Sequence, residues 1–176
     1  MNIWHNIDKK RIKEEDFIAV IEITKGSKTK YELDKETGML ILDRVLYTST
    51  HYPANYGFIP RTYCEDDDPL DVLVLASEPL APMSMVRCYP IGVVRMLDNN
   101  EIDDKIIAIP FEDPTWNNYK DISELSPHIE SEIMHFFSVY KSLEKKPTAA
   151  ITSHGKAKAI KTIKEAIAAY KEKFGA

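Results

Sequence analysis

The stretch best suited to do chemistry is a dense run of carboxylates in the first half of the chain. Five carboxylates fall within the seven residues 65–71, and an apolar run over residues 72–75 follows at once. The apolar run predicts a buried strand, whereas Pro69 lacks a backbone donor and makes the acidic part a loop or strand edge. Two carboxylates about 4 Å apart repel by roughly 4 kcal/mol at an effective dielectric constant near 20. Carboxylates that converge in a cleft therefore need cations, and their oxygens suit Mg²⁺; a solvated acidic turn is the alternative.

Charged side chains that could meet an oxyanion come earlier. Residues 30–33 and 39–44 flank a turn that contains a glycine, which predicts a β-hairpin. Lys30, Glu32 and Arg44 alternate with apolar neighbours, so one face of this hairpin carries opposed charges. Ordinary surface ion pairs are the alternative interpretation.

A further carboxylate and two tyrosines accompany the hairpin. Residues 17–23 predict an apolar strand that Glu22 interrupts, and residues 52–60 predict an ordered loop with two prolines and a glycine. The hydroxyls of Tyr52 and Tyr56 in this loop are either tethered within the core or available to an oxyanion.

The second half of the chain changes from strand to helix patterns. Residues 85–97 and 105–110 predict strands, and the acidic residues 98–104 between them predict a hairpin tip. Helical periodicity then runs over residues 127–142 and 156–174. Strands followed by helices indicate an α+β fold, with a small antiparallel sheet or barrel covered by helices.

Length and composition limit the function further. We expect a single domain over residues 1–176, and the net charge of −5 argues against nucleic acid as a partner. The chain has no apolar run of about 18 residues and no signal-peptide pattern at Met1, so we expect no membrane segment. Two distant cysteines without metal-ligand spacing favour free thiols in a cytoplasmic protein.

Taken together, these motifs resemble the soluble inorganic pyrophosphatases of family I. The family signature Asp-x-Asp-Pro-x-Asp-Val occurs as Asp66–Val72, and the other family motifs follow in family order: Lys30-Tyr31-Glu32, Asp43-Arg44, Tyr52–Phe58, Asp98, Asp103-x-Lys105 and Tyr140-Lys141. The resemblance implies an α+β fold, a five-stranded OB-like β-barrel with helices packed outside, two of them C-terminal.

The resemblance also implies a role for each of these side chains in hydrolysing pyrophosphate. The residues implied to bind several Mg²⁺ ions are Asp66, Asp71, Asp98 and Asp103. Those implied to bind pyrophosphate are Lys30, Arg44, Tyr56, Lys105, Tyr140 and Lys141, with Glu22, Glu32 and Tyr52 supporting the site from behind. Asp68 would be the general base that takes a proton from the attacking water.

The sequence departs from the family pattern at three places. Asp67 stands where family members often have a small residue, which adds a negative charge beside the base. Residues 100–102 differ from the family's second acidic loop, so we make no prediction of that loop's shape. Beyond Lys146 the aromatic family pattern fades, and no role is carried over.

The resemblance bears on assembly, because bacterial members of the family are commonly homo-oligomers and often hexamers. On the helix that begins at Pro127, the side chains of His128, His135 and Val139 share one flank beside the apolar stripe. We expect a homo-oligomer, most simply a hexamer, in which this flank meets its copy; plain surface is the alternative.

Two other functions are alternatives to pyrophosphate hydrolysis. A related metal-dependent hydrolase could act on a larger phosphoanhydride, and a non-catalytic OB-like module could bind cations or phosphate. An oligonucleotide-binding surface would need a basic groove with stacking aromatics, whereas this groove carries five aspartates. The sequence contains no HExxH motif, no P-loop and no serine-centred motif.

Overall fold

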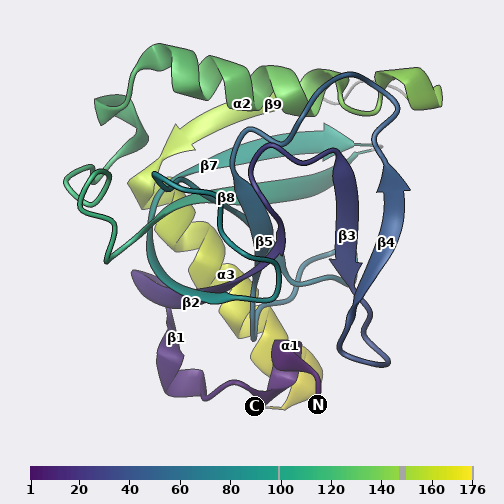
Figure 1. The fold of residues 1–176 in the computed structure, drawn as a ribbon. Coiled ribbons are helices and arrows are strands. Elements are labelled where there is room, and N and C mark those ends of the chain that lie inside the picture. The colour runs from purple at the N-terminus through teal and green to yellow at the C-terminus, as the bar shows by residue number, and fades with distance from the viewer. Residues whose placement is uncertain (99, 147–149, 176) are drawn as a thin grey trace.

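Five strands form a closed ring in the computed structural model. The structure describes residues 1–98, 100–146 and 150–175, and for Asp98 and Ala150 it describes the backbone alone. In ring order they are β2 (Asp16–Ile23), β5 (Asn55–Ile59), β6 (Leu70–Val74), β8 (Glu101–Pro110) and β7 (Met85–Asp98), and β7 closes the ring by pairing with β2 (Figure 1). All neighbours are antiparallel except β6 and β8. The ring confirms the predicted five-stranded barrel.

The remaining elements lie around this ring. Strands β1 (Ile12–Lys13) and β9 (Ala150–Gly155) extend it at β2 and β7, while β3 (Thr29–Leu33) and β4 (Leu40–Val45) form a separate two-stranded sheet. The helices are α1 (Ile3–Asn6), α2 (Pro127–Val139) and α3 (Lys156–Phe174), with single 3₁₀ turns at Lys9–Arg11, Ile122–Glu124 and Ser142–Glu144. Within the described residues, none of these helices has the length and apolar character needed to cross a bilayer.

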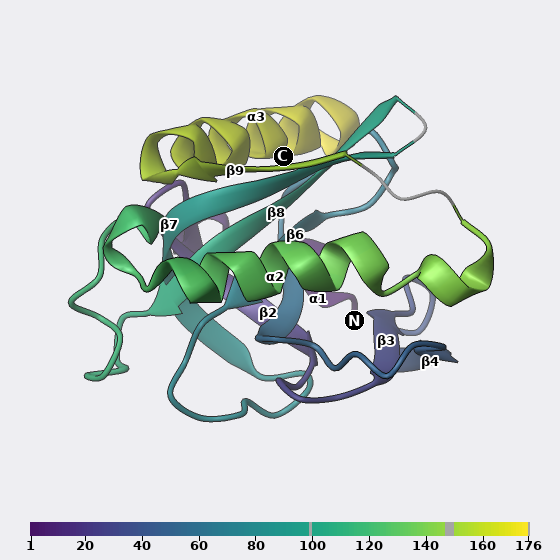
Figure 2. The ribbon, with the colours of Figure 1, turned by 90° about the horizontal axis from the view of Figure 1, so that it is seen from above.

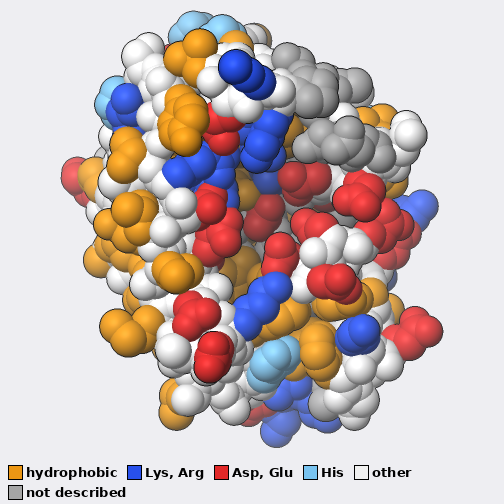
Figure 3. Space-filling view, turned by 90° about the vertical axis from the view of Figure 1, so that its right-hand side faces the viewer, with side chains coloured by type: hydrophobic (Ala, Val, Ile, Leu, Met, Phe, Trp, Pro, Cys, Tyr) orange, Lys and Arg blue, Asp and Glu red, His pale blue; other side chains and the backbone are white. Residues whose placement is uncertain are grey.

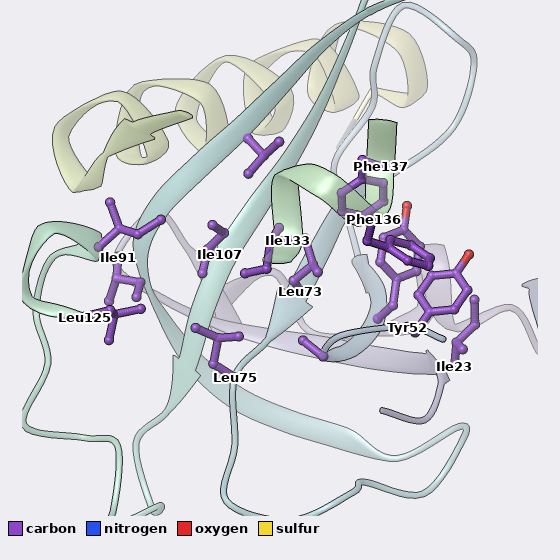
Figure 4. Close-up of a cluster of buried hydrophobic side chains, with 14 of the residues drawn as sticks. Ile23, Tyr52, Leu73, Leu75, Ile91, Ile107, Leu125, Ile133, Phe136 and Phe137 are labelled. Carbon is purple, nitrogen blue, oxygen red and sulfur yellow. The ribbon is translucent and has the colours of Figure 1, made fainter. Parts of the chain in front are cut away.

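Helices α2 and α3 lie on opposite faces of the part of the sheet formed by β7, β8 and β9 (Figure 2), and the two helices late in the chain were predicted. Successive residues of β6 and β8 serve different cores, because neighbouring side chains on a strand point to opposite faces. Leu73 and Ile107 belong to the core under α2 (Figure 4), whereas Val72 and Ile106 belong to the core that α3 covers. Each helix therefore fixes one face of the same two strands.

Two stretches predicted as loop are strand. Residues 55–59 form β5, because Gly57 lets β5 approach β2 closely: a Cβ at Gly57 would lie 1.8 Å from the Val20 carbonyl oxygen. Strand β8 begins at Glu101 rather than near Lys105, so the predicted acidic tip is largely strand paired with β7. The sequence contains prolines and acidic residues here that favour turns, but strand pairing outweighs that preference.

The parallel pair of β6 and β8 is what assembles the two acidic motifs. Its register places Asp71 opposite Lys105, two residues after Asp103. The antiparallel β7–β8 pair carries the second motif to the same end of the barrel as the loop before β6. Carboxylates more than 30 residues apart in sequence therefore meet at one place.

Candidate active site

A cleft of about 570 Å³ lies between the β3–β4 sheet and the barrel, and it holds most of the predicted site. Acidic side chains surround a central hollow and basic side chains gather above it (Figure 3). The predicted residues that line the cleft are Glu22, Lys30, Glu32, Tyr56, Asp66, Asp68, Asp71, Asp103, Lys105, Tyr140 and Lys141. Arg44 and Tyr52 lie just behind its wall, and the side chain of Asp98 lies outside the described part of the chain.

The centre of the cleft is the buried ammonium of Lys105, which is 2% exposed. Its Nζ donates to the Tyr56 hydroxyl at 2.9 Å, to Asp71 Oδ2 at 2.9 Å and to both carboxylate oxygens of Asp103 at 3.3 Å. Burial alone would lower the pKa of Lys105, but Asp103 and Asp71 outweigh it and raise the pKa well above its ordinary value. The ammonium is therefore a fixed positive charge.

Burial penalises the charged forms of the carboxylates around this ammonium. Burial, together with the charges of Asp71, Asp68 and Asp103, raises the pKa of Asp66 to about 6. Burial also raises the pKa of Asp71, although Lys105 opposes that shift. A raised carboxyl pKa means that a further cation nearby would stabilise the charged form.

These carboxylates fit a hard divalent cation in their chemistry. Asp66, Asp71 and Asp103 line the cleft and offer only carboxylate oxygens as metal ligands, which are the ligands that Mg²⁺ prefers. Across the described residues no three acidic, imidazole or thiol side chains converge closely enough to surround an ion, and the Lys105 ammonium lies between Asp71 and Asp103 instead. An ion bound here would therefore compete with the Lys105 ammonium for the carboxylates of Asp71 and Asp103.

The opposite wall of the cleft carries a chain of alternating charges on the β3–β4 sheet. Lys30 donates to Glu32 and, at 3.0 Å, to Asp43, and Asp43 also accepts from Arg44. The Arg44 Nε lies 2.9 Å from the buried carboxylate of Glu144. Lys30, Glu32 and Arg44 were predicted from the sequence. Asp43 precedes Arg44 in the family motif, but no role was predicted for it. Nothing in the sequence indicated Glu144.

Glu22 supports this wall from the barrel. Its side chain is buried and its carboxylate accepts a hydrogen bond from the Leu33 backbone N–H at 2.6 Å, which ties β2 to the end of β3. Burial raises the pKa of Glu22 to about 8, with smaller contributions from the charges of Asp71 and Glu32 and opposition from Leu33 and Lys30. The supporting role of Glu22 stays a prediction.

Aromatic packing fixes the tyrosines. The Tyr52 ring packs on Tyr56 and Phe136 at centroid distances of 5.3 and 4.7 Å, beneath α2 (Figure 4). Tyr140 ends α2 and stacks on Phe136 at 5.2 Å, and the Lys141 ammonium lies 5.3 Å from the Tyr140 ring centroid. Helix α2 thus delivers two predicted phosphate ligands to the cleft beside Tyr56.

The acidic loop before β6 is strained at Asp67, whose φ is +64°. Glycine adopts this left-handed conformation most readily, and aspartate and asparagine adopt it more often than other side chains. In this chain the Tyr63 hydroxyl donates to the Asp67 carboxylate and so engages the extra charge. The neighbouring Asp68 carboxylate accepts from Lys35 in the β3–β4 turn, a contact that the sequence did not suggest.

The family model and the curated relatives that match this chain are inorganic pyrophosphatases. The family model for inorganic pyrophosphatase matches residues 19–171. A soluble inorganic pyrophosphatase 2 from Chlamydomonas reinhardtii is 47% identical over 97% of this chain and 89% of its own length, and a soluble inorganic pyrophosphatase from Zea mays is 55% identical over 83% of this chain and 68% of its own.

Solved structures agree in fold. An inorganic pyrophosphatase from Helicobacter pylori superposes with a TM-score of 0.87 at 44% identity, covering 91% of this chain and 96% of that chain. The inorganic pyrophosphatase from Thermus thermophilus gives a TM-score of 0.89 at 37% identity, covering 97% and 99%. The OB-like barrel with a C-terminal helix is common to them and to this chain. On these matches and on the motifs that line the cleft, the chain belongs to the inorganic pyrophosphatase family.

Proposed function

We propose that this chain hydrolyses inorganic pyrophosphate to two orthophosphates, with Mg²⁺ as cofactor, and that residues 1–176 act as one domain. The observation that carries the proposal is that one cleft gathers both lysines and aspartates, with the Lys105 ammonium hydrogen-bonded to Asp71 and Asp103. Lys30, Lys105 and Lys141 provide positive charge, and Asp66, Asp68, Asp71 and Asp103 provide negative charge. Phosphoryl transfer to water needs positioning and charge neutralisation rather than a covalent intermediate, and this cleft supplies both.

The aspartates of the cleft are where the metal would bind. Asp66, Asp71 and Asp103 would hold the cations, with Asp98 as the fourth expected ligand. Bound divalent cations would lower the pKa of a coordinated water and neutralise phosphate oxygens. The raised pKa values of Asp66 and Asp71 support this assignment, because burial, their largest cause, penalises a charged carboxylate that a bound cation would stabilise.

The basic side chains in and beside the cleft would hold the phosphates. Arg44 and Lys30 sit side by side through their shared partner Asp43, and Lys105 donates from the opposite wall. An arginine fork and compact lysine charges suit the oxygens of two linked phosphates. Asp68 lies at the rim with a half-exposed carboxylate, where it can accept a proton from the attacking water.

The test of this function is release of orthophosphate from pyrophosphate in the presence of Mg²⁺. We expect turnover that stops in EDTA, and a matched variant, Lys161→Met, that behaves as the wild type because Lys161 lies exposed on α3. The second candidate, a non-catalytic module that binds cations or phosphate, predicts binding without release. No phosphate release from purified chain at any Mg²⁺ concentration would contradict our proposal.

The metal ligands have a separate test. Asp71→Ala should raise the Mg²⁺ concentration needed for half-maximal activity and weaken Mg²⁺ binding measured by isothermal titration, because Asp71 faces the cleft beside both Asp66 and Asp103. Glu165→Ala, on the exposed face of α3, is the control. An unchanged affinity and number of sites in Asp71→Ala would remove Asp71 from the ligands.

Assembly and compartment complete the proposal. We expect a homo-oligomer, with a hexamer as the simplest case, in which the flank of α2 that carries His128 and His135 meets its copy. Both imidazoles are exposed on the single chain, which leaves them available for such a contact. The unpaired thiols of Cys64 and Cys88 support a reducing compartment such as the cytoplasm.

A further inference from the structure

Lys35 lies in the turn between β3 and β4, and its ammonium crosses the rim of the cleft to the acidic loop. It donates to the Asp68 carboxylate and to the Asp67 carbonyl oxygen, the latter at 3.2 Å. Among the residues that the structure describes, Lys35 is the one side chain that donates to the Asp68 carboxylate. The sheet that carries Lys30 and Arg44 is thereby joined directly to the loop that carries Asp68.

The position of Lys35 is itself fixed by the start of the chain. Asn2 Nδ2 donates to the Lys35 carbonyl oxygen at 2.9 Å, and the Lys35 ammonium lies 5.3 Å from the centre of the Trp4 ring. Trp4 is buried and donates from Nε1 to the Thr62 carbonyl oxygen at 2.9 Å. The Thr62 hydroxyl accepts from the Leu70 backbone N–H at 2.8 Å, so the same support holds both ends of the acidic loop.

The turn around Lys35 is built to keep this shape. The Asp34 backbone N–H donates to the Met39 carbonyl oxygen at 2.7 Å, and the Gly38 N–H donates to the Asp34 carbonyl oxygen at 2.8 Å. Gly38 has a φ of +77°, and a Cβ at Gly38 would lie 2.3 Å from the Met1 carbonyl oxygen. The turn therefore packs against the N-terminal residues, and this packing fixes the position of Lys35 at the rim of the cleft.

We infer that Lys35 is a positioning residue for Asp68, holding its carboxylate over the cleft in the orientation that accepts the proton of the attacking water. The inference rests on the proposed function, which makes Asp68 the base. The ion pair is half exposed, at 48% for Lys35 and 50% for Asp68, and exposed pairs add little to overall stability. Its effect falls instead on geometry, where a small displacement of a reacting group slows the chemical step strongly.

The kinetic test uses three variants in the phosphate-release assay at saturating Mg²⁺. Lys35→Met should lower kcat by about tenfold while KM changes by less than about twofold, because positioning of the base affects the chemical step rather than substrate binding. Lys35→Arg should recover most of kcat, since a guanidinium can donate to the same carboxylate and lie over the Trp4 ring. Lys161→Met is the control, because it removes the same charge from an exposed ion pair on α3.

A double variant shows whether Lys35 acts through Asp68. In an Asp68→Asn background, Lys35→Met should cost less than about twofold in kcat, because the carboxylate that Lys35 orients is already gone. A full additional tenfold loss overturns the inference. A rise in KM with unchanged kcat in Lys35→Met also overturns it, because Lys35 would then be binding the substrate directly.

Hydrogen exchange provides a measurement that is independent of turnover and of metal. The acidic loop is closed by the Cys64 N–H to the Asp68 carbonyl oxygen at 2.9 Å and by the Asp67 N–H to the Cys64 carbonyl oxygen at 3.1 Å. In the metal-free chain these amides should exchange faster in Lys35→Met than in the wild type or Lys161→Met, and equal exchange refutes the inference. A wild type that releases no phosphate refutes the proposed function instead, and this exchange experiment still decides whether Lys35 holds the loop.

Discussion

Replacing Lys105 by Met removes the one positive charge that Asp71 and Asp103 share in the described part of the cleft. Truncating one partner of a buried ion pair costs about 3–5 kcal/mol, because the remaining charge stays buried without compensation. The two carboxylates keep side-chain exposures of 26% and 31%, so water offsets part of this loss. We therefore expect the lower end, about 3 kcal/mol, for the metal-free chain.

That free energy converts into a measurable melting temperature. In a chain of this size 1 kcal/mol corresponds to roughly 2–4 °C, so Lys105→Met should melt about 6–12 °C below the wild type in EDTA. Mg²⁺ at a hundredfold excess over its dissociation constant stabilises a protein by about 2.7 kcal/mol. Because the variant has lost a competing cation, the gain in Tm on adding Mg²⁺ should be larger for Lys105→Met than for the wild type.

Differential scanning calorimetry at neutral pH, with EDTA or with Mg²⁺, measures both quantities. Lys161→Met is the control, because its ion pair with Glu165 on α3 is exposed on both sides and adds little to stability. A Lys105→Met variant that melts within about 2 °C of the wild type in EDTA would refute Lys105 as the countercharge of the cluster. A smaller Mg²⁺ gain in the variant than in the wild type would refute competition between the ammonium and the metal.

Three further changes test other parts of the molecule. Asp68→Asn should lower turnover about 10²–10⁴-fold while keeping the fold and Mg²⁺ binding, and a phosphate-release rate above half that of the wild type would contradict this. Glu22 has its pKa raised from 4.5 to about 8, so the folded chain keeps a proton that the unfolded chain releases. As the pH rises from about 5.5 to 7.5, the free energy of unfolding of the metal-free wild type, measured with urea and compared with that of Glu22→Gln, should thus fall by about 1.4 kcal/mol per pH unit. A difference that does not change with pH would show that Glu22 is already charged in the folded chain. His135→Glu should reduce the mass measured by light scattering at neutral pH while leaving circular dichroism unchanged, because like charges would face each other across a symmetric contact; an identical mass would place His135 outside the interface.

The sequence predictions that the structure confirms came from local patterns of residues. The helical stripe predicted residues 156–174 as a helix, and α3 has those bounds. Gly38 has the positive φ expected of the glycine in the predicted hairpin turn. These features depend on local periodicity and on the conformational freedom of glycine, both of which can be read from neighbouring residues.

Contacts between distant segments could not be predicted in the same way. The carboxylate of Glu144 reaches Arg44 only because the 3₁₀ turn after α2 folds back on β4, and Lys35 reaches Asp68 only because α1 supports the hairpin turn. Nothing in the residues around Glu144 or Lys35 reports those distances. Strand β5 was missed for a related reason, since Gly57 and the flanking Pro53 and Pro60 are typical of a loop, and only the neighbouring β2 shows why a glycine is needed there.

The parallel pairing of β6 with β8 also has a consequence for how the chain folds. Asp71 and Lys105 are 34 residues apart, and the whole of β7 lies between them and must cross the barrel before the two strands can pair. Closing such a segment costs chain entropy that short hairpins avoid, so pairs of this kind form late. We therefore expect the β3–β4 hairpin, which depends on local contacts, to form before the β6–β8 pair brings Asp66 and Asp71 to Asp103.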